Sequence, residues 1–98
     1  MPVVVEFDNE ITAGLTSVTV YALDRPGALS RIARAFLTCE LSVHAAKIAT
    51  IGEKLEDVFF VSDRSGHPIT DSAVLDKLQR TLTETLSSNA DKPDNQND

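Results

Sequence analysis

The sequence predicts an α+β sandwich, in which one face of an antiparallel sheet is covered by two helices. Three observations lead to this prediction. Short β-branched or alternating apolar stretches, typical of strands, occur in four places. Two other stretches repeat apolar residues every three or four positions, which is typical of amphipathic helices. These elements follow one another as β, β-α-β-β-α within 98 residues, a common size for a single domain.

The first two strands are expected to form a hairpin at the edge of the sheet. Residues 3–7 (VVVEF) are a short β-branched run, and residues 8–14 carry turn formers. Residues 17–23 (SVTVYAL) alternate most clearly and form the best strand. Because consecutive strands joined by a short loop usually pair antiparallel, we expect 3–7 to lie beside 17–23.

The first helix is expected from Pro26 to Cys39. Proline is favourable in a first helical turn, since its missing N–H would have no partner there. Residues 42–51 (SVHAAKIATI) indicate a second long strand, which a turn at 52–54 joins to a third strand at 55–62 (LEDVFFVS).

The third core strand places two aromatic neighbours on opposite faces of the sheet. Phe59 and Phe60 are adjacent, so one of them must leave the helix-covered side. We interpret the second ring as part of a docking surface and expect self-association through the open face or a sheet edge.

The second helix is expected to open at Thr70 or Asp71, which are both good N-cap residues. Its apolar stripe consists of Leu75, Leu78, Leu82 and Leu86. From residue 87 the sequence reads SSNADKPDNQND, which has no large apolar residue. We therefore divide the chain into a domain at 1–86, with an edge strand and loop at 1–15 and a core at 16–86, and a disordered tail at 87–98.

The core order β-α-β-β-α is most of a split βαβ, ferredoxin-like sandwich. The strand that usually closes this fold after the second helix has no counterpart in the sequence. It would lie antiparallel beside the first core strand, where the hairpin also places residues 3–7. We therefore predict a permuted sheet, in which the N-terminal strand takes the place of the last one.

Composition excludes several classes of partner. A net charge of −6 argues against nucleic acid and anionic membranes, because both favour clustered Lys and Arg. Cys39 is the only cysteine, so no intramolecular disulfide can form, which suits a reducing cytoplasm. The sequence has no signal peptide and no apolar run of membrane-spanning length.

The turn between the first core strand and the first helix is the candidate site. A helix that opens at Pro26 and Gly27 leaves backbone N–H groups free at Gly27, Ala28 and Leu29, where the helix dipole favours an anion. Arg25 adds a cation, and Asp24 can accept an ammonium group. One corner with both charges suits a zwitterion such as an amino acid. From these residues alone, a plain helix-opening turn capped by Asp24 is the better interpretation.

This turn resembles the ACT domain, a small-molecule regulatory module of ferredoxin-like fold. The resemblance rests on LDRPG at 23–27, which ends a strand, and on AL at 28–29, which opens a helix. Three further stretches resemble the last ACT domain of the protein-PII uridylyltransferase/uridylyl-removing enzyme family. They are VEFDNE at 5–10, IATIGE at 48–53 and EDVFFVSD at 56–63. The resemblance covers residues 2–86.

The resemblance implies a regulatory, glutamine-sensing role in the cytoplasm, without catalytic activity or a cofactor in this chain. The family adds and removes uridylyl groups on the P-II signal protein, with catalytic residues in upstream domains. The implied partners are an amino-acid effector, a sister ACT domain or a second copy, and P-II protein through the parent enzyme. The implied ligand residues are Asp24, Arg25, Pro26, Gly27, Ala28 and Leu29, with Ser42 contributed by a neighbouring copy. His44 follows Ser42 by two residues and is a candidate for the same interface, although a half-buried structural histidine is the preferred interpretation.

Other functions fit the sequence less well. A heavy-metal carrier of this fold needs a CxxC motif, and an RNA-recognition domain needs basic surroundings. A small enzyme needs a nucleophile or base among convergent groups, and none is evident. The remaining alternative is a domain that only packs against its neighbours and binds no ligand.

Overall fold

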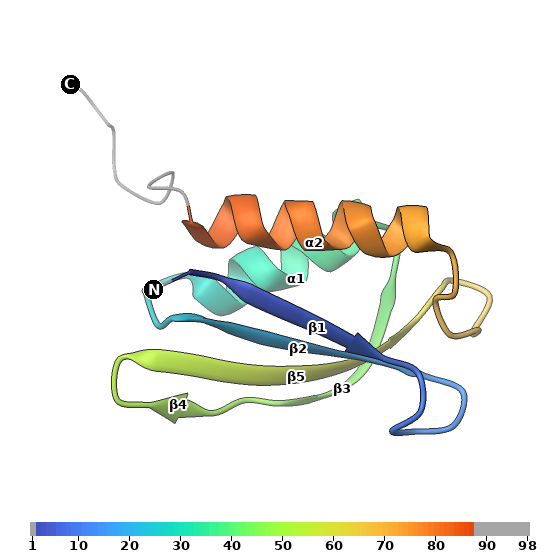
Figure 1. The fold of residues 1–98 in the computed structure, drawn as a ribbon, viewed down its shortest axis with the longest axis horizontal. Helices are drawn as coiled ribbons and strands as arrows, with labels where there is room; N and C mark the ends of the chain where they lie inside the picture. Colours follow the sequence, from blue (N-terminus) through green and yellow to red (C-terminus); the bar gives the residue numbers. More distant parts are fainter. Residues whose placement is uncertain (1, 88–98) are drawn as a thin grey trace.

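The computed structural model describes residues 2–87, which form a two-layer α+β sandwich (Figure 1). Both helices lie on one face of the sheet, and the other face is open. This architecture confirms the predicted fold class and is compatible with a ferredoxin-like ACT fold. The elements in chain order are β1 (Val4–Asp8), β2 (Thr16–Leu23), α1 (Ala28–Thr38), β3 (Ser42–Lys47), β4 (Thr50–Ile51), β5 (Lys54–Ser62) and α2 (Ser72–Ser87).

The sheet has five strands in the order β1-β2-β5-β3, with β4 also paired to β5. Every pair is antiparallel. The N-terminal strand β1 lies at the edge beside β2, with Val5 opposite Val20 and Phe7 opposite Val18. The prediction that this strand occupies the edge beside the first core strand is therefore confirmed.

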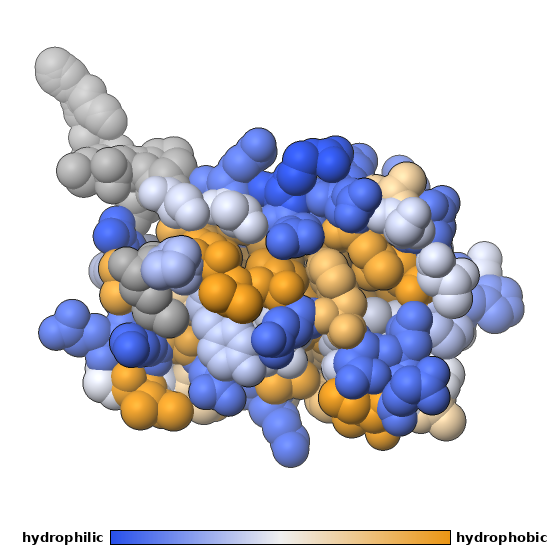
Figure 2. Space-filling model, in the orientation of Figure 1, coloured by the Kyte–Doolittle hydropathy of each residue, from blue (hydrophilic) through white to orange (hydrophobic). Residues whose placement is uncertain are grey.

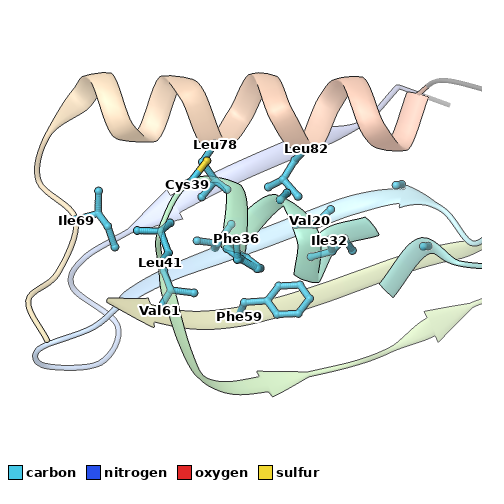
Figure 3. Close-up of a cluster of buried hydrophobic side chains, with 14 of the residues drawn as sticks. Val20, Ile32, Phe36, Cys39, Leu41, Phe59, Val61, Ile69, Leu78 and Leu82 are labelled. Atoms are coloured by element: carbon cyan, nitrogen blue, oxygen red, sulfur yellow. The ribbon is translucent and has the colours of Figure 1, made fainter. Parts of the chain in front are cut away.

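The core lies between the sheet and the two helices (Figure 3). Alternation along β2 and β5 points one row of side chains at the helices, where Val20 and Val61 have no exposed surface. The rings of Phe36 on α1 and Phe59 on β5 pack with their centroids 5.1 Å apart. Phe60 lies on the opposite face and is half-buried, so the predicted separation of the two neighbouring rings is confirmed.

Helix α2 covers β1 as well as the centre of the sandwich. Leu78 and Leu82 are fully buried, and Leu75 and Leu86 pack partly buried at the margin. Figure 2 shows the result as a band of hydrophobic residues beneath the polar outer side of α2. Asp71 caps the helix, because its Oδ1 accepts the Ala73 N–H at 2.9 Å.

The prediction of a single long strand at 42–51 is wrong. It divides into β3 and β4, with a bulge between Val43 and Ala45 and a break at residues 48–49. In the break, the Ala49 carbonyl still accepts the Glu56 N–H, but the Ala49 N–H turns to the side chain of Asp57. A side-chain acceptor on the neighbouring strand therefore replaces a ladder bond, which is a long-range effect that alternation cannot reveal.

The helix boundaries also differ from the expected ones. α1 begins at Ala28, because Gly27 lies in the left-handed region at φ 83° and serves as the N-cap. Pro26 is thus in the preceding turn. α2 extends to Ser87, and the rest of the tail expected at 87–98 lies outside the described residues.

Candidate functional site

The turn between β2 and α1 is held by two backbone hydrogen bonds. The Asp24 N–H donates to the Glu53 carbonyl at 2.8 Å, which ties the end of β2 to the loop before β5. The Ala28 N–H donates to the Arg25 carbonyl at 3.0 Å. The prediction that the Ala28 amide is free is therefore wrong, because Arg25 to Ala28 closes a four-residue turn.

Other amides at this helix start have no acceptor. Within residues 2–87, the N–H groups of Gly27, Leu29 and Ser30 make no hydrogen bond, and no side chain caps α1. Unpaired amides at a helix N-terminus carry the positive end of the helix dipole and favour an anion. The amides that could bind an anion are therefore those of Gly27, Leu29 and Ser30, in place of the predicted Gly27, Ala28 and Leu29.

These amides border a small surface cavity of about 210 Å³, here named the α1 hollow. One wall is the turn and first residues of α1, and the other is formed by the break after β3 together with β5. Drug-sized ligands occupy pockets of about 300–1,000 Å³, so this hollow suits a smaller molecule. Its lining residues are Asp24, Arg25, Gly27, Ala28, Leu29, Ser30, Ile48, Thr50, Leu55 and Asp57.

Asp57 is the feature of this hollow that sequence reasoning missed. Its side chain faces the helices in the row with Leu55 and Phe59, and the residue is 2 % exposed. Its Oδ1 accepts the Ala49 N–H at 3.1 Å. Burial raises the pKa of the Asp57 carboxyl, and the negative charge of Asp24 raises it further. An acid in an otherwise apolar strand row is the sequence signal that identifies it.

Six of the eight predicted site residues come together at the turn, and two lie elsewhere. Asp24, Arg25, Gly27, Ala28 and Leu29 line the α1 hollow. Pro26 lies in the same turn and lines a narrower crevice toward the end of α2.

Ser42 and His44 lie at the other end of the sheet. Ser42 pairs with Ser62, whereas Leu23 pairs with Lys54 at the far end of β5. Eight residues of strand separate the two positions, which corresponds to roughly 26 Å. Within one chain, Ser42 is therefore far from the turn, and neither Ser42 nor His44, which lies in the bulge opposite Phe60 and Val61, is among the residues that line the α1 hollow.

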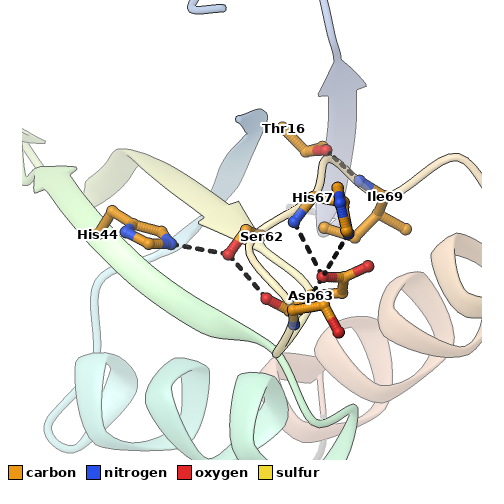
Figure 4. Close-up of polar contacts among 7 residues, drawn as sticks. Thr16, His44, Ser62, Asp63, His67 and Ile69 are labelled. Carbon is orange, nitrogen blue, oxygen red and sulfur yellow. Dashed lines mark hydrogen bonds and ion pairs between the residues drawn. The ribbon is translucent and has the colours of Figure 1, made fainter. Parts of the chain in front are cut away.

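His44 takes part in a polar contact of its own (Figure 4). Its Nε2 lies 2.7 Å from the hydroxyl of the buried Ser62, and that hydroxyl donates to the Asp63 carbonyl at 2.8 Å. With the Ser62 proton on this carbonyl, the Ser62 oxygen can accept from the Nε2–H tautomer of His44.

Residues 2–87 contain no group of three or more His, Cys, Asp or Glu side chains that could hold a metal ion. None of the helices described is long and apolar enough to span a membrane.

Fold and site together define an α+β domain of ferredoxin-like ACT type, with a small polar hollow at the strand-to-helix turn. No protein-family model matches the chain. The chain is homologous to one segment of the bifunctional uridylyltransferase/uridylyl-removing enzyme. It is 41 % identical to that of Pseudomonas savastanoi pv. phaseolicola over 89 % of this chain, 43 % identical to that of Ectopseudomonas mendocina over 91 %, and 42 % identical to that of Azotobacter vinelandii over 85 %.

The chain spans only about a tenth of the length of these relatives, 10 %, 10 % and 9 % respectively. Most of each relative therefore has no counterpart in the 98 residues. The homology supports a regulatory domain of such an enzyme, in agreement with the ACT-like architecture.

Proposed function

We propose that this chain is an amino-acid-binding regulatory domain, and that glutamine is its effector. In this proposal it controls an enzyme that adds uridylyl groups to a P-II signal protein and removes them. The α1 hollow carries the proposal, because unpaired amides and two carboxylates border one cavity of amino-acid size. The assignment to this enzyme is supported by the homologues, which are named bifunctional uridylyltransferase/uridylyl-removing enzyme.

The charges in the hollow suit a zwitterion. The ligand carboxylate would accept from the amides of Leu29 and Ser30, at the positive end of α1. The ligand ammonium would face the acidic groups, of which Asp24 lies at the turn itself. Gly27 has no Cβ, and a Cβ built there would stand in open space with no atom within 4 Å, so a ligand can approach the backbone at this position.

A second copy or a sister domain is proposed to complete the site. Strand β3 is the free edge of the sheet, and its residues after Ser42 are exposed. If two β3 strands paired antiparallel, Ser42 of one copy would lie near Lys47 of the other. Lys47 precedes Ile48, which lines the hollow, so such pairing brings Ser42 and His44 toward the ligand of the neighbouring copy.

The test is a thermal titration of the chain with L-glutamine. At about a hundred times its dissociation constant, a ligand stabilises the folded state by roughly 2.7 kcal/mol, which corresponds to a melting shift on the order of ten degrees. Gly27→Val should abolish the shift, because its side chain stands at the ligand approach. Amide NMR signals of residues 24–30 should move in the wild type.

Gly14→Val is the matched control. Gly14 has nearly the same φ, 82° against 83°, and also open space around its Cβ, but it lies in the β1–β2 loop outside the hollow. It should suffer the same backbone strain and keep the glutamine shift. If neither glutamine nor any other amino acid shifts the wild type, the ligand-binding proposal is wrong.

The second candidate is a domain that only packs against its neighbours. It is favoured by the open sheet face, where Phe60, Val58 and Tyr21 are half-buried without a covering layer. A wild type that binds no amino acid but associates through this face or the β3 edge supports that candidate. Light scattering over a concentration series measures the association.

A further inference from the structure

Asp57 has a buried carboxylate that the fold leaves incompletely paired. It lies on the helix-covered face of β5, between Leu55 and Phe59, which are each 4 % exposed, and is itself 2 % exposed. A charge in such surroundings is unfavourable unless it is paired or hydrogen-bonded. Within residues 2–87, Asp57 forms no ion pair with Lys, Arg or His.

The hydrogen bonds of Asp57 use one of its two oxygens. Oδ1 accepts the Ala49 N–H, and Oδ2 accepts nothing from any residue in the described range. An ionised carboxylate has about four acceptor positions, and buried acceptors are nearly always satisfied. Among residues 2–87, Asp57 therefore has fewer donors than an ionised carboxylate can accept.

A donor from outside the described residues can reach Asp57 through the α1 hollow, because Asp57 lines that cavity and is otherwise buried. Two charged residues share the lining with it, Asp24 and Arg25. Asp24 repels its charge, and Arg25 forms no ion pair with it. A positively charged group that donates hydrogen bonds would satisfy the carboxylate, and the volume of the hollow limits that group to a small molecule.

We propose that Asp57 receives the charged amino group of the effector, while the amides of Leu29 and Ser30 hold its carboxylate. This inference rests on the proposed function and restricts the class of effector that the hollow can bind. The ligand must be a free α-amino acid, because a 2-oxo acid or an N-acylated amino acid has no ammonium group to donate. Asp24 then contributes to the negative field of the hollow and is not the main receptor.

Asp57→Asn in the full chain tests the assignment by isothermal titration with L-glutamine. Asparagine keeps the shape and an acceptor for the Ala49 N–H but loses the charge. Removing one partner of a buried charged hydrogen bond should weaken binding about a hundredfold. Glu56→Gln is the matched control, because Glu56 is the adjacent acid on the same strand, is exposed and faces the open side. It should bind as the wild type does.

A second measurement does not depend on the variant. The wild type should bind L-glutamine and fail to bind N-acetyl-L-glutamine at the same concentrations. If Asp57→Asn binds L-glutamine as tightly as Glu56→Gln does, or if the acetylated compound binds equally well, the role of Asp57 is overturned and the proposed function stands. If no free amino acid binds the wild type, both fail.

Discussion

The two ends of helix α1 share a backbone conformation but differ in how their polar groups are satisfied. Gly27 before the helix and Glu40 after it both lie in the left-handed region, at φ 83° and 60°. At the C-terminal end, the amides of Cys39, Glu40 and Leu41 donate to the carbonyls of Ala35, Leu37 and Phe36. At the N-terminal end, the amides of Gly27, Leu29 and Ser30 have no acceptor within residues 2–87.

The C-terminal end therefore has the features of a completed Schellman-type cap, which needs nothing from outside. In the described part of the chain, the N-terminal end has no side-chain cap, and the nearby buried Asp57 has no second hydrogen-bond partner. An unusual backbone angle alone therefore does not indicate a site. Unpaired donors and acceptors around one cavity do, because a ligand can gain what the protein does not supply.

Gly27→Val should produce the largest change in stability among four tests of this difference. A left-handed conformation costs residues with a Cβ about 1–2 kcal/mol, and β-branched side chains are at the upper end. We expect a loss of about 2 kcal/mol in the free energy of unfolding, measured by urea denaturation. Glu40→Val should lose less, since position 40 already carries a Cβ. Equal losses at the two positions would contradict this account.

Asp57→Asn tests the N-terminal end of α1, where Asp57 is incompletely paired, through the pH dependence of stability. Because the pKa of Asp57 is raised in the folded state above its ordinary value of 3.8, the folded protein binds more protons than the unfolded chain between the two values. Wild-type stability should therefore fall as pH rises through that window, and the asparagine variant should lack this component. Unfolding curves from pH 3.5 to 7 measure the difference, which should grow with pH. Parallel profiles would refute the raised pKa.

Glu40→Gly tests the C-terminal end of α1, where the polar backbone groups are hydrogen-bonded. Glycine relieves about 1–2 kcal/mol of left-handed strain but adds about 0.4–1 kcal/mol of unfolded-state entropy. We expect a net gain of about 0.5 kcal/mol, with unchanged glutamine binding. Glu40→Ala keeps the Cβ and serves as the control for the lost carboxylate. A gain equal to that of the alanine variant would show that strain is not the cause.

Asp63→Asn should give the smallest change in stability. Asp63 lies at an exposed loop near the C-terminal end of α1. Its Oδ1 accepts the N–H groups of His67 and Ser65, both at 2.9 Å, and these bonds lower the pKa of the Asp63 carboxyl. The stabilisation is present above the ordinary pKa of 3.8 and is lost as pH falls through the lower folded value. The variant should be less stable at pH 7 and should match the wild type in strong acid. Chemical denaturation at both pH values is the measurement.

Several parts of the fold could be predicted from local patterns. Alternation in β2, the leucine stripe of α2 and the turn residues after β1 each depend on neighbours within a few positions. The edge position of β1 also followed, because a short loop leaves an antiparallel hairpin as the simple arrangement. The helix-opening turn was located correctly for the same reason, since LDRPG combines a strand end with a helix start.

The sequence by itself determined the order of the elements, the face that each strand buries and the place of the turn, because these follow from side-chain periodicity and backbone preference. Only the tertiary structure decided which polar groups remain unpaired. The Ala49 amide donates to the side chain of Asp57 on the neighbouring strand, and Ser42 lies a strand length from Leu23 at the turn. Such partners are chosen when distant segments close around one another, so no local pattern contains them.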